Sequence, residues 1–201
     1  MIYLLRHGEV EGDAERRFIG QSDPPLSGAG RHHARAWKKI LVPVEWDAVF
    51  CSDLRRSEET ARIIAGDKLA AVGTMAKLRE IHLGQWEGLA MTFVRRHFPK
   101  QWRKRGDDLA NYQPPGGESF KDLQERVVPA FEALSVQLKG HGLIVAHAGV
   151  NRVILCHILG MPLSNLFRLG QDYGALNIID YGRNASRVLA LNLRSGDFQN
   201  R

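Results

Sequence analysis

The chain has 201 residues and a mass of 22.6 kDa, enough to bury one sizeable hydrophobic core, and we expect a single domain over residues 1–201. Apolar residues make up 44% and charged residues 25%, which are globular values that exclude an intrinsically disordered chain. The net charge of +6 suits an anionic partner, but it does not distinguish a phosphorylated metabolite from nucleic acid or lipid.

The first apolar run meets Arg6 and His7 at once, so we expect neither a signal peptide nor a membrane span, and we predict a cytoplasmic protein. The cysteines, Cys51 and Cys156, lie far apart in the sequence, and neither belongs to a metal-binding spacing. We expect two buried free thiols.

Short apolar runs typical of buried parallel strands occur at residues 2–5, 48–51 and 143–146, with weaker candidates at 70–75, 176–180 and 188–193. Helical patterns alternate with these runs. Ser27 begins one that reaches Ile40, and Ser52 or Asp53 can cap another. A third, amphipathic pattern covers residues 118–138. This alternation predicts a three-layer α/β/α fold around a mostly parallel sheet, whose ligands bind at the carboxyl ends of the strands.

Three of the strand candidates run directly into residues that can do chemistry. The first is followed by Arg6 and His7, the second by a segment that contains Arg55 and Arg56, and the third by His147. Parallel strands would bring these ends to one crevice. Arginine matches the geometry of phosphate oxygens, and neutral imidazole is a competent nucleophile. The pattern therefore predicts a cationic phosphate pocket that contains a histidine nucleophile.

Four motifs at these positions resemble a known family. They are Arg6-His7-Gly8-Glu9 with Gly20-Gln21-Ser22; Ser52-Asp53-Leu54-Arg55-Arg56-Ser57 with Thr60; Glu80-Ile81-His82-Leu83-Gly84-Gln85-Trp86-Glu87-Gly88; and Ala146-His147-Ala148-Gly149 with Arg152. Their identity, order and spacing resemble the histidine phosphatase superfamily, also called phosphoglycerate mutase-like. The resemblance covers nearly the whole chain.

The resemblance implies a role for each matched residue. His7 attacks the phosphorus in line, and Glu80 acts as general acid for the leaving group. Glu87 is the competing carboxylate, and we favour Glu80 because it opens its motif. The resemblance implies no metal and no cofactor. The residues implied to bind phosphate are Arg6, Arg56, His147 and Gln21.

One position departs from the family pattern. Where the family usually has an asparagine, this chain has Asp13, and a second anion beside a phosphate should repel it. Either Asp13 points away, or it is protonated or paired with Arg16 or Arg17, or this subgroup contacts its substrate differently. We leave Asp13 out of the predicted site.

The resemblance implies a phosphomonoesterase that acts on a small phosphorylated metabolite. Segments 115–120, 147–152 and 166–177 look like α-ribazole phosphatases of cobamide synthesis, which makes α-ribazole 5'-phosphate one candidate substrate. A broad-specificity sugar phosphatase and a cofactor-dependent phosphoglycerate mutase remain alternatives. Mutases of this type usually carry a longer segment after the third motif.

A basic and aromatic stretch at residues 95–105 motivates a rival interpretation as a nucleic-acid-binding protein. In the family, the segment after the third motif forms a variable helical cap, here around residues 89–115, and we expect stretch 95–105 to face the substrate or the solvent. The predicted partner is a small anionic phosphomonoester, with no nucleic acid and no membrane. We expect a monomer or a homodimer.

Overall fold

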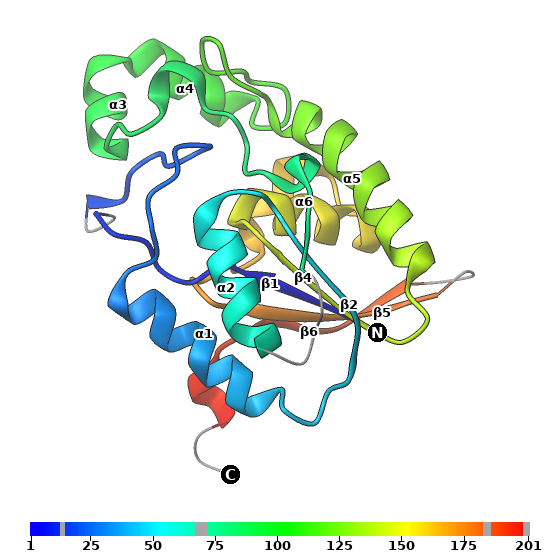
Figure 1. The fold of residues 1–201 in the computed structure, drawn as a ribbon. Helices are drawn as coiled ribbons and strands as arrows, with labels where there is room; N and C mark the ends of the chain where they lie inside the picture. Colours follow the sequence, from blue (N-terminus) through cyan, green and yellow to red (C-terminus); the bar gives the residue numbers. More distant parts are fainter. Residues whose placement is uncertain (13–14, 67–71, 183–185, 199–201) are drawn as a thin grey trace.

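The structure is a computed structural model that describes residues 1–12, 15–66, 72–182 and 186–198. Its centre is a sheet with the strand order β3-β2-β4-β1-β5-β6 (Figure 1). Strands β3, β2, β4 and β1 run parallel to one another, whereas β5 is antiparallel to β1 and β6 is antiparallel to β5. The predicted mostly parallel sheet is confirmed. The strands are β1 (Ile2–Arg6), β2 (Trp46–Cys51), β3 (Gly73–Thr74), β4 (His141–Ala146), β5 (Leu176–Tyr181) and β6 (Ser186–Leu193).

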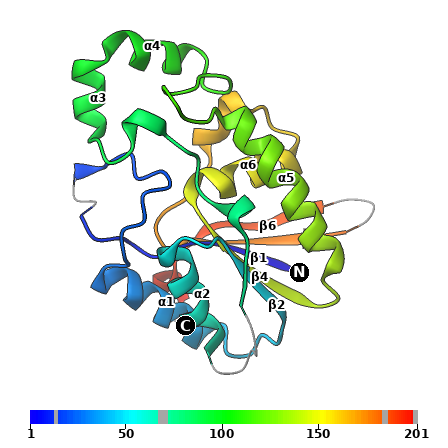
Figure 2. The same cartoon turned by 45° about the horizontal axis from the view of Figure 1, so that its top comes forward.

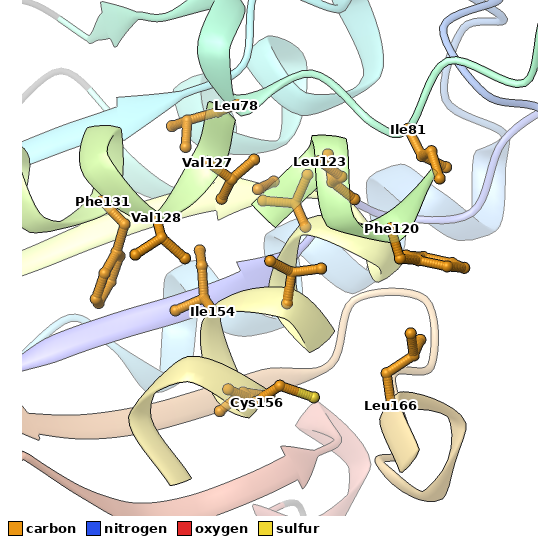
Figure 3. Close-up of a cluster of buried hydrophobic side chains, with 14 of the residues drawn as sticks. Leu78, Ile81, Phe120, Leu123, Val127, Val128, Phe131, Ile154, Cys156 and Leu166 are labelled. Carbon is orange, nitrogen blue, oxygen red and sulfur yellow. The ribbon is translucent and has the colours of Figure 1, made fainter. Parts of the chain in front are cut away.

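Two separate hydrophobic clusters lie on the two faces of the sheet, which confirms the three-layer arrangement. Helices α1 (Gly28–Ile40) and α2 (Arg55–Ala65) pack with Leu143 and Val145 of β4 on one face. Helices α5 (Phe120–Gln137) and α6 (Ala148–Leu159) pack with Ile144 on the other face. Adjacent residues of one strand point to opposite faces, so both faces of the central strand are buried. Figure 3 shows the α5 side chains Phe120, Leu123, Val127 and Phe131 lined up along this second cluster.

The helix cap predicted at Ser27 is confirmed, and the one predicted at Ser52 or Asp53 is wrong. Ser27 caps α1 by accepting a hydrogen bond from the Gly30 N–H, and Ser119 caps α5 in a reciprocal capping box. At α2 the N-cap residue is Leu54, without a side-chain cap. Ser52 and Asp53 are engaged elsewhere, with His147 and Arg79 respectively, so neither hydroxyl nor carboxylate caps this helix.

Helices α3 (Met91–His97) and α4 (Pro99–Asp107) stand apart from the sheet, beside the segment that follows β1 (Figure 2). Backbone hydrogen bonds join the two segments, from Met91 N to Arg16 O and from Phe18 N to Leu89 O. Short 3-10 helices occur at Ala76–Leu78, Gly84–Trp86, Leu163–Arg168 and Ser195–Phe198. Within the described residues, no helix has the length and apolar character needed to cross a membrane.

Candidate active site

Three neighbouring strands end at the candidate site. In the order β2-β4-β1, the residues that follow the strands are Ser52, His147 and His7. The backbone continues the ladder past the strand ends, because His7 N donates to Ala146 O at 3.0 Å and Ser52 N donates to Val145 O at 3.2 Å. The His7 and His147 ring centroids lie 5.0 Å apart. The sheet therefore sets the spacing of the two imidazoles.

His7 is held as a neutral imidazole with one nitrogen directed at the site. Its Nδ1 lies 2.7 Å from Gly8 O, so Nδ1 carries the proton and donates it to this carbonyl. That tautomer leaves a lone pair on Nε2, to which Arg56 Nε donates at 3.2 Å. Burial, followed by the charges of Arg56 and Arg6, lowers the pKa of His7 well below its usual value. His7 therefore offers an unprotonated Nε2, the form of imidazole that a nucleophile requires.

Both predicted arginines reach His7 from fixed positions. Arg56 is 1% exposed, and its two terminal nitrogens donate to Ser22 O at 2.6 Å and Gly20 O at 2.8 Å. Arg6 donates to Gln171 O at 2.7 Å and stacks on the Tyr173 ring, with its guanidinium carbon 3.6 Å from the ring centroid. These contacts hold two cations beside the neutral imidazole of His7, an arrangement that suits a phosphoryl group.

His147 is completely buried and has one nitrogen without a hydrogen-bond partner among the described residues, namely Nδ1. Its Nε2 lies 2.6 Å from Ser52 Oγ. Because Ser52 Oγ accepts from Leu54 N at 3.4 Å, its own hydrogen is available for Nε2. This places the imidazole proton on Nδ1. Burial and the Arg56 charge lower the pKa of His147 well below its usual value, so it is a neutral donor.

The structure separates the two competing carboxylates. Glu80 lines the same cavity as His7 and accepts from two backbone N–H groups, those of Ile81 at 2.9 Å and Gly149 at 3.0 Å. Glu87 lies outside that cavity wall. It accepts from Gln21 N at 2.8 Å, Ser22 Oγ at 3.2 Å and Leu83 N at 3.1 Å. Glu87 therefore holds the loop whose carbonyls bind Arg56, and Glu80 is the carboxylate that can meet a substrate.

The remaining sequence expectations have different outcomes. Neither Gln21 nor the fully buried His147 lines the cavity, and the Gln21 side-chain amide donates to Glu80 O at 3.1 Å. Arg55 is exposed, as expected for a residue outside the site. Asp13 lies outside the described residues.

The site opens into a cavity of about 600 Å³. Besides Arg6, His7, Arg56 and Glu80, its wall contains residues that sequence reasoning did not assign to the site: Arg105 of α4, Arg152 of α6, Phe167 and Tyr173. Tyr173 also contacts His7, with ring centroids 5.6 Å apart. None of these four residues directly follows a strand. The criterion that identified the two histidines, a position at the end of a predicted strand, could therefore not identify them.

Within the part of the chain that the structure describes, no cluster of three or more His, Cys, Asp or Glu side chains is arranged to hold a metal ion.

Comparison with known proteins decides the family. The sequence model of the histidine phosphatase superfamily (branch 1) matches residues 2–194. The chain belongs to this superfamily. This membership accounts for the four sequence motifs together. The protein is therefore a phosphatase of the histidine type.

Individual histidine phosphatases are similar over nearly the whole chain. An adenosylcobalamin/α-ribazole phosphatase of Escherichia coli K12 is 27% identical over 99% of this chain and 98% of its own. A probable phosphoglycerate mutase of Serratia proteamaculans is 35% identical over 90% and 84%. The crystal structure of the Shigella flexneri α-ribazole phosphatase superposes with a TM-score of 0.88, at 27% identity and 96% coverage of both chains.

Proposed function

We propose that this histidine phosphatase hydrolyses a small phosphomonoester through a phosphohistidine on His7. In the first step the Nε2 lone pair forms a bond to phosphorus, and the bond from phosphorus to the ester oxygen breaks. Glu80 gives a proton to the departing oxygen. In the second step Glu80 takes a proton from water, which attacks phosphorus and returns the bond electrons to Nε2. The products are an alcohol and inorganic phosphate.

The observation that supports this proposal is the pair of buried imidazoles in complementary states. His7 presents a lone pair, whereas His147 presents a donor that has no partner among the described residues. If a phosphoryl group lay between them, its phosphorus would accept the lone pair of His7 Nε2, and one of its oxygens would accept a hydrogen bond from His147 Nδ1. Arg6 and Arg56 supply positive charge for the other oxygens. Charge and orientation are most of what phosphoryl transfer requires.

The substrate side of the proposal rests on the cavity and on the relatives. Residues 1–201 would form one catalytic domain, with residues 89–115 as a cap over the mouth of the site. The relatives are named for α-ribazole phosphate, for glucosyl-3-phosphoglycerate and for phosphoglycerate. These compounds, with sugar phosphates and a phosphopeptide, form the panel of substrates to test. A preference for the phosphopeptide would contradict the proposal of a small-metabolite substrate.

The mechanism is tested by trapping the intermediate. We expect His7→Ala to abolish both turnover and an acid-labile phosphoenzyme, and a chelator to leave activity intact. Glu80→Gln should slow turnover by about 100-fold or more, because proton transfer from a positioned group contributes about that much. Glu87→Gln should act through stability and loop position instead. An inactive Glu87→Gln beside a fully active Glu80→Gln would reverse the assignment of the general acid.

A mutase is the second candidate, because one relative at 35% identity is named a probable phosphoglycerate mutase. A mutase would return the phosphoryl group from His7 to another hydroxyl of the substrate. Incubation with 3-phosphoglycerate distinguishes the two activities: a phosphatase releases inorganic phosphate, and a mutase accumulates the 2-phospho isomer. Isomerisation much faster than phosphate release would replace the phosphatase proposal.

A further inference from the structure

The cavity wall is strongly cationic beyond the reactive end. It contains six arginines, Arg6, Arg16, Arg17, Arg56, Arg105 and Arg152, and two acidic residues, Glu80 and Asp172. Both acidic residues are already engaged. Asp172 pairs with Arg194 at 2.6 Å, and Glu80 accepts the two backbone hydrogen bonds described above. The wall therefore has more positive charge than one phosphate can use.

Arg105 is a cation of this wall without polar contacts in the part of the chain that the structure describes. Within the described residues it has no hydrogen bond and no ion pair. Its guanidinium carbon lies among three aromatic rings, 5.8 Å from the Phe18 centroid, 5.9 Å from Trp102 and 5.5 Å from Phe167. Desolvation lowers its pKa from the usual value. A guanidinium removed from water without an anion is costly, and an anion that enters the cavity would relieve that cost.

Arg152 stands on the same aromatic ring. Its guanidinium carbon lies 5.3 Å from the Phe167 centroid, and within the described residues its hydrogen bonding is limited to one bond, from Nε to Leu169 O at 2.9 Å. The charges that act on Arg152 include those of Arg6 and Glu80, and its guanidinium shares the Phe167 ring with Arg105. The charges that act on His7 are those of Arg56 and Arg6. The arginines thus extend from the phosphate site toward the cap.

We propose that Arg105 and Arg152, which both lie within 5.5 Å of the Phe167 centroid, bind a carboxylate on the leaving group of the substrate. This inference rests on the proposed function, since it takes His7 as the phosphoryl acceptor. The substrate class is then a phosphomonoester that also carries a carboxylate, such as a phosphorylated hydroxy acid. A carboxylate fits better than a second phosphate here, because the surroundings of Arg105 are aromatic and offer few further donors for a dianion. A substrate with a neutral leaving group would leave both guanidinium groups without an anion.

The test uses two substrates that differ only at the proposed contact. 3-Phosphoglycerate carries a carboxylate where glycerol 3-phosphate carries a hydroxymethyl group. We expect the wild type to prefer 3-phosphoglycerate in kcat/KM for phosphate release by at least about tenfold, which corresponds to about 1.4 kcal/mol. Arg105→Gln and Arg152→Gln should each reduce this ratio severalfold or more. Because both rates are measured on the same preparation, an inactive fraction cancels from the ratio.

Arg103→Gln is the matched control, since Arg103 lies on the same helix but is exposed and outside the cavity wall. It should leave the ratio unchanged. Phenyl phosphate separates the two proposals. A wild type that hydrolyses phenyl phosphate but shows no preference for the carboxylate would overturn the carboxylate site and leave the phosphatase standing. A wild type that forms no phosphoenzyme with any of these esters would overturn the proposed function itself. A ratio that falls equally in Arg103→Gln would also refute the assignment.

Discussion

Ser52→Ala is the substitution that best tests how the site prepares His147. The Ser52 hydroxyl lies 2.6 Å from His147 Nε2, and both residues are completely buried. In the wild type this hydroxyl fixes the proton on Nδ1, where a phosphoryl oxygen would be bound. Without the hydroxyl, His147 Nε2 no longer accepts a hydrogen bond, and the imidazole can carry its proton on Nε2 instead of Nδ1.

The expected loss is large in rate and moderate in stability. Removing one preorganised donor to a developing charge costs about 100-fold to 1000-fold in kcat, so we expect a fall of that order for Ser52→Ala. Leaving a buried nitrogen unsatisfied costs about 1–3 kcal/mol in the free energy of unfolding. Ser57→Ala is the matched control. Ser57 is also completely buried, and it loses one hydrogen bond, to Val145 O at 2.7 Å, that does not involve His147.

The assay is steady-state kcat together with urea unfolding of each variant. Ser52→Ala and Ser57→Ala should be destabilised by similar amounts, while only Ser52→Ala loses most of its kcat. If Ser57→Ala loses as much kcat as Ser52→Ala, the loss reflects general loosening of this wall and the tautomer argument is wrong.

Amide replacements of His147 separate its two nitrogens. An asparagine amide can place its nitrogen near the position of Nδ1, whereas a glutamine amide reaches the position of Nε2. We expect His147→Asn to keep more kcat than His147→Gln. Adding Ser52→Ala to His147→Asn should cost little further kcat, because no tautomer remains to be fixed. A more active glutamine variant would refute the assignment of Nδ1 as the donor.

Three further predictions follow from the packing. Gly149→Ala would place a Cβ 2.4 Å from Glu80 Oε1, so we expect kcat to fall about 10-fold to 100-fold, with Gly28→Ala, which has open space, as control. Burial raises the pKa of Cys51 to about 12, so alkylation at pH 8 should require denaturant, as mass spectrometry would show. The two site histidines have lowered pKa values, so the unfolded chain binds more protons than the folded chain below pH 6.5. As the pH is lowered below 6.5, the free energy of unfolding should therefore decrease by up to about 2.7 kcal/mol per pH unit. His147→Asn should halve that slope, as urea unfolding at several pH values would show.

The part of the fold that could be predicted is the part where apolar side chains lie on both faces of a strand. Strands β1, β2 and β4 are apolar on both faces, so their runs are nearly continuous in the sequence and predict parallel strands. The antiparallel pairing of β5 with β1 and of β6 with β5 could not be predicted, because an apolar run carries no sign of its direction. The start of α2 was wrong for a chemical reason: a serine and an aspartate before a helix usually cap it, but here both side chains have stronger partners.

The part of the site that could be predicted is the part at the strand ends. His7, His147 and Arg56 come together because β1, β4 and β2 are neighbours, and this follows from the sheet. Glu80 follows no strand of this group, and only the family resemblance indicated it. The sequence shows that Ser52 directly follows β2, but it does not show that the Ser52 hydroxyl lies 2.6 Å from His147 Nε2. Its position at a strand end was a usable signal that the capping interpretation obscured.

The basic and aromatic stretch 95–105 shows how a structure changes the meaning of a sequence pattern. In the sequence alone, its mixture of basic and aromatic residues resembles a nucleic-acid-binding segment. In the structure, the helical repeat of α4 places Trp102 and Arg105 on one side, where they contact Phe18, while Arg103 and Lys104 are exposed. Of residues 95–105, only Arg105 lines the cavity. The cation that we propose to select the substrate is therefore distinguished by its position on the helix, and we expect substitutions of Arg103 or Lys104 to leave the reaction unchanged.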